Sequence, residues 1–118
     1  MKARSFTLAL VAAVVALVYA PFASPNASAQ QVTRVTVTMK EFKFTLSKKI
    51  VPHGTVVFKL VNKGSLSHDF KIQGKKSKMI GKGKTGTLTV ALTKGSKTYV
   101  CTVPGHAVAG MKGKLKVT

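Results

Sequence analysis

Near its C-terminus this 118-residue chain reads Cys101-Thr102-Val103-Pro104-Gly105-His106-Ala107-Val108-Ala109-Gly110-Met111. The stretch holds the only cysteine of the chain, a histidine five residues later and a methionine five residues after that. Its proline and two glycines are turn formers, so we predict a loop that bends back between two strands. A thiolate, an imidazole and a thioether in one loop form a soft set of metal ligands.

A second histidine, His68, adds to this set. It lies in the strand-like run Ser67-His68-Asp69-Phe70 and reaches the loop only if its strand lies alongside. One thiolate and two imidazoles suit the trigonal plane of a blue-copper site, and a methionine sulfur at longer range tunes the potential. The candidate metal ligands are therefore His68, Cys101, His106 and Met111, and copper is the predicted cofactor.

Each candidate ligand also has an ordinary structural explanation. A single cysteine at a strand end is commonly a small buried hydrophobe, and methionine is a common core residue. His106 fits an exposed turn, and His68 fits a hydrogen-bonded core position. The joint occurrence of all four, in a chain with three histidines and four methionines, favours copper. The third histidine, in Pro52-His53-Gly54, is predicted as a surface turn residue.

Alternating apolar and polar residues predict an all-β domain. Within residues 32–39, for example, Val35, Val37 and Met39 share one face. Such alternation, interrupted by frequent turn residues, is typical of a β-sandwich or barrel. The segment 74–86 is rich in lysine and glycine and is predicted as a solvated loop. The predicted strands, about seven in number, cover residues 32–39, 42–46, 55–62, 67–73, 87–92, 97–101 and 111–117.

The aromatic residues are predicted to belong to the core. Phe42, Phe44, Phe58 and Phe70 stand at alternating strand positions, and Tyr99 shares a strand face with the cysteine and is expected beneath the site. No aromatic residue is left to form a stacking platform for bases. Nucleic acid is therefore not an expected partner.

The N-terminus has the layout of a secretory signal peptide. Lys2 and Arg4 precede the apolar run 6–18, and Ala27-Ser28-Ala29 matches a cleavage site. We predict a signal peptide over residues 1–29 and a copper-binding domain over residues 30–118. The protein is then exported, to a periplasm or to the outside of the cell. The alternative is that the segment is retained as a membrane anchor, although the apolar run is short for a membrane-spanning helix.

The charge of the chain is extreme. It has 20 Lys and Arg against two Asp and Glu, a net charge of +18, which falls to +16 once the leader is removed. Such an excess attracts acidic proteins and anionic surfaces. We expect an acidic redox protein (a cytochrome, reductase or oxidase) as partner, and association with an anionic membrane or cell-envelope surface. A single cysteine forms no internal disulfide, so a bound metal would contribute to the stability of this small, monomeric domain.

Two segments resemble those of a known family. The run Tyr99 to His106, followed by Ala109-Gly110-Met111-Lys112-Gly113, looks like the ligand loop of cupredoxins, the type 1 copper proteins of the plastocyanin/azurin family. Asn62-Lys63-Gly64 followed by His68-Asp69-Phe70 resembles their other ligand segment. The resemblance implies a Greek-key β-sandwich with copper at one end, outer-sphere electron transfer, and Met111 as the axial ligand.

The chain departs from the family pattern at two points. Many members carry asparagine after the first ligand histidine, whereas this chain has Asp69. We predict that Asp69 accepts a hydrogen bond from Thr102 and so supports the ligands. The acidic docking surface of some plastocyanins cannot exist in a chain with two carboxylates.

Electron carriage is the leading functional hypothesis, and the alternative is an extracytoplasmic copper carrier or chaperone. His106 is expected to present its ring edge to solvent, surrounded by Pro104, Ala107, Val108 and Ala109. A polyanion-binding module with incidental copper is a third hypothesis. An enzyme is not expected, because four ligands leave no open metal position for a substrate.

Overall fold

The computed structural model describes residues 2, 3, 13, 15, 16 and 31–118. The predicted signal peptide and its cleavage site therefore lie, apart from five isolated positions, outside the described residues. Among the residues described there is no helix with the length and apolar character needed to cross a membrane.

Residues 31–118 form nine strands and no helix. Three of the strands are only two residues long, and two of these, at residues 50–51 and 75–76, lie outside the seven predicted strands. The strands are β1 (Thr33–Lys40), β2 (Lys43–Leu46), β3 (Ile50–Val51), β4 (Gly54–Asn62), β5 (Lys71–Ile72), β6 (Lys75–Lys76), β7 (Thr85–Leu92), β8 (Gly95–Val100) and β9 (Lys112–Val117).

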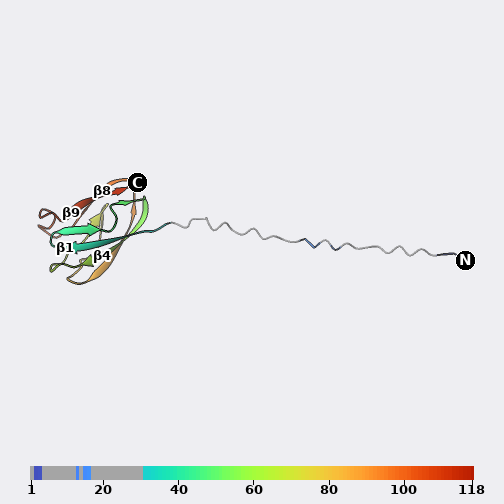
Figure 1. Ribbon diagram of the computed structural model, residues 1–118, viewed down its shortest axis with the longest axis horizontal. Coiled ribbons are helices and arrows are strands. Elements are labelled where there is room, and N and C mark those ends of the chain that lie inside the picture. The colour runs from blue at the N-terminus through green and yellow to red at the C-terminus, as the bar shows by residue number, and fades with distance from the viewer. Residues whose placement is uncertain (1, 4–12, 14, 17–30) are drawn as a thin grey trace.

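The strands form two sheets that pack face to face. One sheet has the order β2-β1-β4-β7 and the other β3-β9-β8-β5-β6. Figure 1 shows β1 and β4 in one layer and β8 and β9 in the other. The pairs β1–β4 and β3–β9 are parallel and the others antiparallel, because the chain repeatedly crosses from one sheet to the other. The prediction of an all-β sandwich is confirmed.

The core follows the predicted alternation. Val37 and Met39 of β1 and Phe58 and Leu60 of β4 are fully buried, and their neighbours along the strands face outward. The register places Val37 beside Leu60, so the inward residues of the two strands form one apolar layer. Removal of this apolar surface from water is the main driving force for the sandwich.

The prediction that Phe42 is a core strand residue is wrong. Phe42 lies in the turn between β1 and β2 and is 38% exposed. The alternation of Phe44 and Leu46 does not extend back to it, because the chain turns over at Glu41 and Phe42 before β2 begins.

The predicted strand over residues 67–73 is shorter than expected. His68 forms only an isolated bridge with Ile80, and regular pairing begins at Lys71. The backbone bonds of this bridge are 3.0 Å and 2.7 Å long. The segment 74–86 is therefore more than a solvated loop, because Ile80 is buried and holds the backbone of His68.

Candidate metal centre

The loop from Cys101 to Met111 is closed by its own backbone. The Cys101 N–H donates to the Met111 carbonyl at 3.1 Å, and the Met111 N–H donates to the His106 carbonyl at 3.0 Å. These bonds hold the two ends of the loop side by side where β8 ends and β9 begins. The Cys101 and Met111 side chains are consequently buried in the core, and His106 is 7% exposed.

The structure brings three of the four predicted ligands together. His68 Nδ1 lies 3.1 Å from His106 Nδ1, and Cys101 Sγ lies 3.6 Å from His106 Nδ1. The donor atoms of His68, Cys101 and His106 all fall within 4.8 Å of one another. Nitrogen and sulfur ligands lie about 2.0–2.3 Å from a bound metal ion, so ligands of one ion are about 3–4 Å apart. The two separations that involve His106 lie in this range, so the three donors converge as the ligands of a single metal ion do.

Met111, the fourth predicted ligand, lies at the end of the same loop. Its side chain is fully buried and belongs to the apolar core that also contains Cys101. Two imidazoles, a thiol and a thioether in an apolar, water-poor environment suit copper better than the hard cations, which prefer oxygen ligands. Burial also raises the pKa of the Cys101 thiol. Metal binding must therefore displace a proton from it.

The predicted hydrogen bond between Asp69 and Thr102 is confirmed. The Thr102 N–H donates to one oxygen of Asp69 at 2.6 Å, and its hydroxyl donates to the other oxygen. Asp69 is 1% exposed, whereas Thr102 is exposed, so the acceptor of both bonds is buried. They tie the residue after His68 to the residue after Cys101, and thereby join the two ligand segments.

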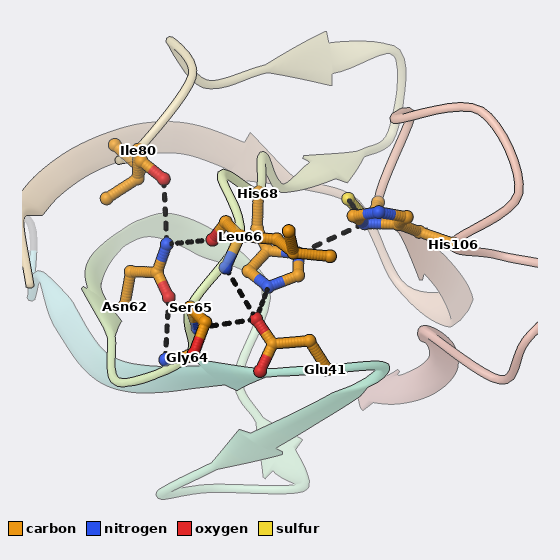
Figure 2. A network of polar contacts seen from close by, with 9 residues as sticks. Glu41, Asn62, Gly64, Ser65, Leu66, His68, Ile80 and His106 are labelled. Carbon is orange, nitrogen blue, oxygen red and sulfur yellow. Dashed lines mark hydrogen bonds and ion pairs between the residues drawn. The ribbon is translucent and has the colours of Figure 1, made fainter. Parts of the chain in front are cut away.

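The sequence analysis did not find the contact between Glu41 and His68. Glu41 lies in the turn after β1, and its Oε1 is 3.3 Å from His68 Nε2. The same oxygen accepts the N–H groups of Ser65 and Leu66 at 2.6 Å and 2.7 Å. The hydrogen bond from Leu66 is the main reason that the pKa of Glu41 is lowered to about 2. Figure 2 shows His68 between Glu41 and His106.

Asn62 holds the same segment from its other side. Its amide donates to the carbonyls of Leu66 and Ile80, both at 2.8 Å, and its oxygen accepts the Gly64 N–H at 2.9 Å. Every polar atom of this buried side chain is thus hydrogen-bonded (Figure 2). The backbone leading to His68 is fixed by these contacts and by those of Glu41.

Aromatic contacts surround the site. The rings of Phe42 and His106 meet edge to face with their centroids 5.0 Å apart. Tyr99 stacks on Phe70 at 5.5 Å, and burial raises the pKa of its hydroxyl. His53 is exposed and contacts the carbonyl of the last residue at 2.9 Å, in agreement with its predicted place in a surface turn.

A family model for copper-binding proteins of the plastocyanin/azurin family matches residues 23–118. The chain belongs to this family. Membership confirms the resemblance drawn from the two ligand segments. The cofactor is copper, and the convergence of His68, Cys101 and His106, with Met111 at the end of the loop, fits one type 1 ion.

Solved structures of similar fold include two auracyanins and a rusticyanin. Auracyanin B is 21% identical, with 77% of this chain and 91% of that chain covered and a TM-score of 0.66. Auracyanin A, a "blue" copper protein from Chloroflexus aurantiacus, is 21% identical. The match covers 75% of this chain and 100% of that chain, with a TM-score of 0.64. Rusticyanin from Thiobacillus ferrooxidans is 24% identical. The match covers 74% of this chain and 77% of that chain, with a TM-score of 0.62. At these identities the likeness establishes the fold alone. Comparison with curated protein sequences returned no match.

Proposed function

We propose that this protein is a single-electron carrier in which His68, Cys101, His106 and Met111 would hold one copper ion. Bound copper supplies one-electron chemistry by alternating between Cu(I) and Cu(II). The observation that carries the proposal is the convergence of three buried donor atoms within 4.8 Å. These side chains come from two distant segments whose backbones are already fixed.

The residues around the donors favour electron transfer over catalysis. Asp69 and Thr102 join the two ligand segments, and the backbone bonds between Cys101 and Met111 close the loop. Donors held in this way keep their positions when the charge of the site changes, which keeps the cost of electron transfer low. Four protein donors leave no open position for a substrate. A blue copper oxidase from Nitrosomonas europaea has a similar fold, but this chain covers 39% of it at 16% identity.

An acidic redox protein is the proposed partner. His106 is 7% exposed, and the exposed side chains of Phe42, which packs against its ring, and Val108, two residues later in the chain, provide an apolar area. Next to this area, β1, β2 and the segment after β4 line a shallow hollow that contains Lys40, Lys43 and Lys63. An apolar contact area beside positive charge would allow close approach while steering a negatively charged partner. Docking on anionic membrane or cell-envelope surfaces would use the same charge.

We further propose that residues 1–29 are removed on export and that residues 30–118 work as a monomer in a periplasm or outside the cell. The positive start, apolar run and Ala27-Ser28-Ala29 support this proposal. Mass spectrometry of the protein recovered from the producing cell should give an N-terminus at Gln30. An intact N-terminus on the membrane fraction would identify an anchor instead.

The decisive experiment is the visible spectrum of the purified protein after addition of Cu(II). An intense thiolate-to-copper band is expected, and Cys101→Ser and His106→Ala should abolish it. His53→Ala is the matched control, because His53 lies outside the donor cluster. Absence of the band in the unmutated protein would overturn the proposal. Rapid loss of copper to a chelator, without reversible electron transfer, would identify a copper carrier instead.

A further inference from the structure

We propose that Glu41 is a positioning residue for the copper ligand His68 and that its negative charge lowers the reduction potential of the site. The inference rests on the proposed function, because it concerns the same metal centre. Neither Glu41 nor the turn that carries it belongs to the segments that predicted the ligands. The two nitrogens of the His68 ring supply the structural basis for this role.

The two ring nitrogens of His68 have different partners. Nδ1 faces His106 Nδ1 at 3.1 Å, and Nε2 faces Glu41 Oε1 at 3.3 Å. His68 is fully buried, and within residues 31–118 the hydrogen-bond partner of its Nε2 is Glu41. An ionised carboxylate accepts hydrogen bonds and donates none, so the ring proton belongs on Nε2. Nδ1 then keeps its lone pair and points it toward Cys101 and His106, as a metal ligand must.

Glu41 is itself held in place. Its Oε1 accepts the N–H groups of Ser65 and Leu66, which lie three and two residues before His68 in the chain. A Cβ added at Gly64 would overlap the Glu41 carboxylate, so the glycine provides the space that this carboxylate occupies. The carboxylate cannot turn away without giving up two backbone hydrogen bonds.

The Glu41 carboxylate lies against the site and is not paired with the surface lysines within residues 31–118. The chain contains 20 lysines and arginines, yet within residues 31–118 none of them forms an ion pair with Glu41, whose carboxylate contacts His68 instead. The Glu41 side chain is 29% exposed, and that of His68 is fully buried. A carboxylate on the far side of a ligating imidazole increases the donor strength of the ring. It therefore stabilises the more positive, oxidised metal and lowers the reduction potential.

Three variants separate charge from position. Glu41→Gln keeps an acceptor oxygen for the backbone N–H groups and for His68 but removes the charge. Glu41→Ala removes both, and Gly64→Ala displaces the carboxylate without changing its charge. Ser96→Lys, at an exposed position at the start of β8, changes the net charge by the same amount as Glu41→Gln and serves as the control.

The first measurement is the midpoint potential of the copper-loaded protein. Glu41→Gln, Glu41→Ala and Gly64→Ala should all shift the midpoint upward, and Ser96→Lys should leave it unchanged. Affinity for Cu(II), measured by competition with EDTA, should fall by about 10–100-fold in Glu41→Ala. An unchanged or lower midpoint in Glu41→Gln would overturn the proposed effect of the charge.

The second measurement needs no copper. Nitrogen-15 spectra of the imidazoles in the metal-free protein should show His68 with its proton on Nε2. Glu41→Gln should keep this tautomer, and Glu41→Ala should lose the preference for it. A proton on Nδ1 of the unmutated protein would overturn the positioning role, even if Gly64→Ala fails to fold. A missing thiolate-to-copper band would refute the proposed function, while the metal-free spectra would still decide whether Glu41 orients His68.

Discussion

Single residues at the site are constrained on two sides. His68 has one ring nitrogen toward the donor cluster and the other toward Glu41. Asp69 uses both of its oxygens on Thr102. Such pairs leave few alternative positions for a buried side chain, because moving it would leave a polar group without a partner. The positions of the ligand segments are therefore set in part by hydrogen bonds to Glu41 and Asp69, which are not among the candidate ligands.

Asp69→Ala is expected to lower the free energy of unfolding of the metal-free protein by about 1–3 kcal/mol, because the Thr102 donors lose a buried acceptor. Asp69→Asn keeps one acceptor oxygen and should cost less. Urea denaturation measures both effects.

The matched control for this change is Gln73→Ala. Gln73 also accepts a backbone N–H and a hydroxyl from one threonine, Thr93, but at an exposed position where water replaces the lost acceptor. If Asp69→Ala lowered the free energy of unfolding by no more than Gln73→Ala, the stabilising role of the buried Asp69 acceptor would be contradicted.

Elements from three parts of the chain meet at the metal centre. They are the turn between β1 and β2, the segment between β4 and β5, and the loop between β8 and β9. The first contributes Glu41 and Phe42, the second His68, and the third Cys101 and His106. The two sheets hold the ends of these connections, so the packing of the strands sets the distances between the donors.

Gly113→Ala tests how closely β8 and β9 must pack under the site. Gly113 pairs with Tyr99, and a Cβ there would overlap the Tyr99 ring. The ring cannot move freely, because it packs against Phe44 and Phe70. We expect a loss of about 1–3 kcal/mol in the free energy of unfolding. Ser96→Ala, on the exposed start of β8, should change it by less than about 0.5 kcal/mol, and equal effects would refute the steric argument.

The whole molecule is a small sandwich with a large positive charge, +18 over the full chain. The charge is spread over many lysines, but the metal centre lies at one end. Lysines near that end should therefore govern the approach of a redox partner, and lysines at the other end should contribute less at physiological salt, where charges are screened beyond about 8 Å.

Electron transfer from the reduced protein to hexacyanoferrate(III), an anionic probe, should become slower as salt is added. We expect the second-order rate constant, measured by stopped flow at low salt, to fall several-fold in the double variant Lys40→Gln/Lys43→Gln. These lysines face each other beside the turn that carries Phe42. The control, Lys49→Gln/Lys116→Gln, removes the same charge at the opposite end of β9. Equal effects of the two variants, or no dependence on salt, would contradict steering toward the site.

Much of the fold follows from local patterns. The alternation in residues 32–39 and 55–62 correctly predicted two core strands, because period two places one face of each strand inward. The same reasoning failed at Phe42, because the chain turns there and successive side chains no longer alternate between the two faces of a strand. It also overextended the strand around His68, where a buried histidine and a buried aspartate follow one another.

The sequence by itself determined the metal and pointed to candidate donors, since the rare residues Cys101, His106 and Met111 lie together in one loop and their chemistry suits copper. It also determined the link between Asp69 and Thr102, through the resemblance of their segments to a known pattern. Only the tertiary structure decided that Glu41 lies against His68, 27 positions away. No local period encodes that contact, because it depends on how the turn after β1 packs against the segment after β4. The donors are thus a property of the chain, and the environment of His68 is a property of the folded sandwich.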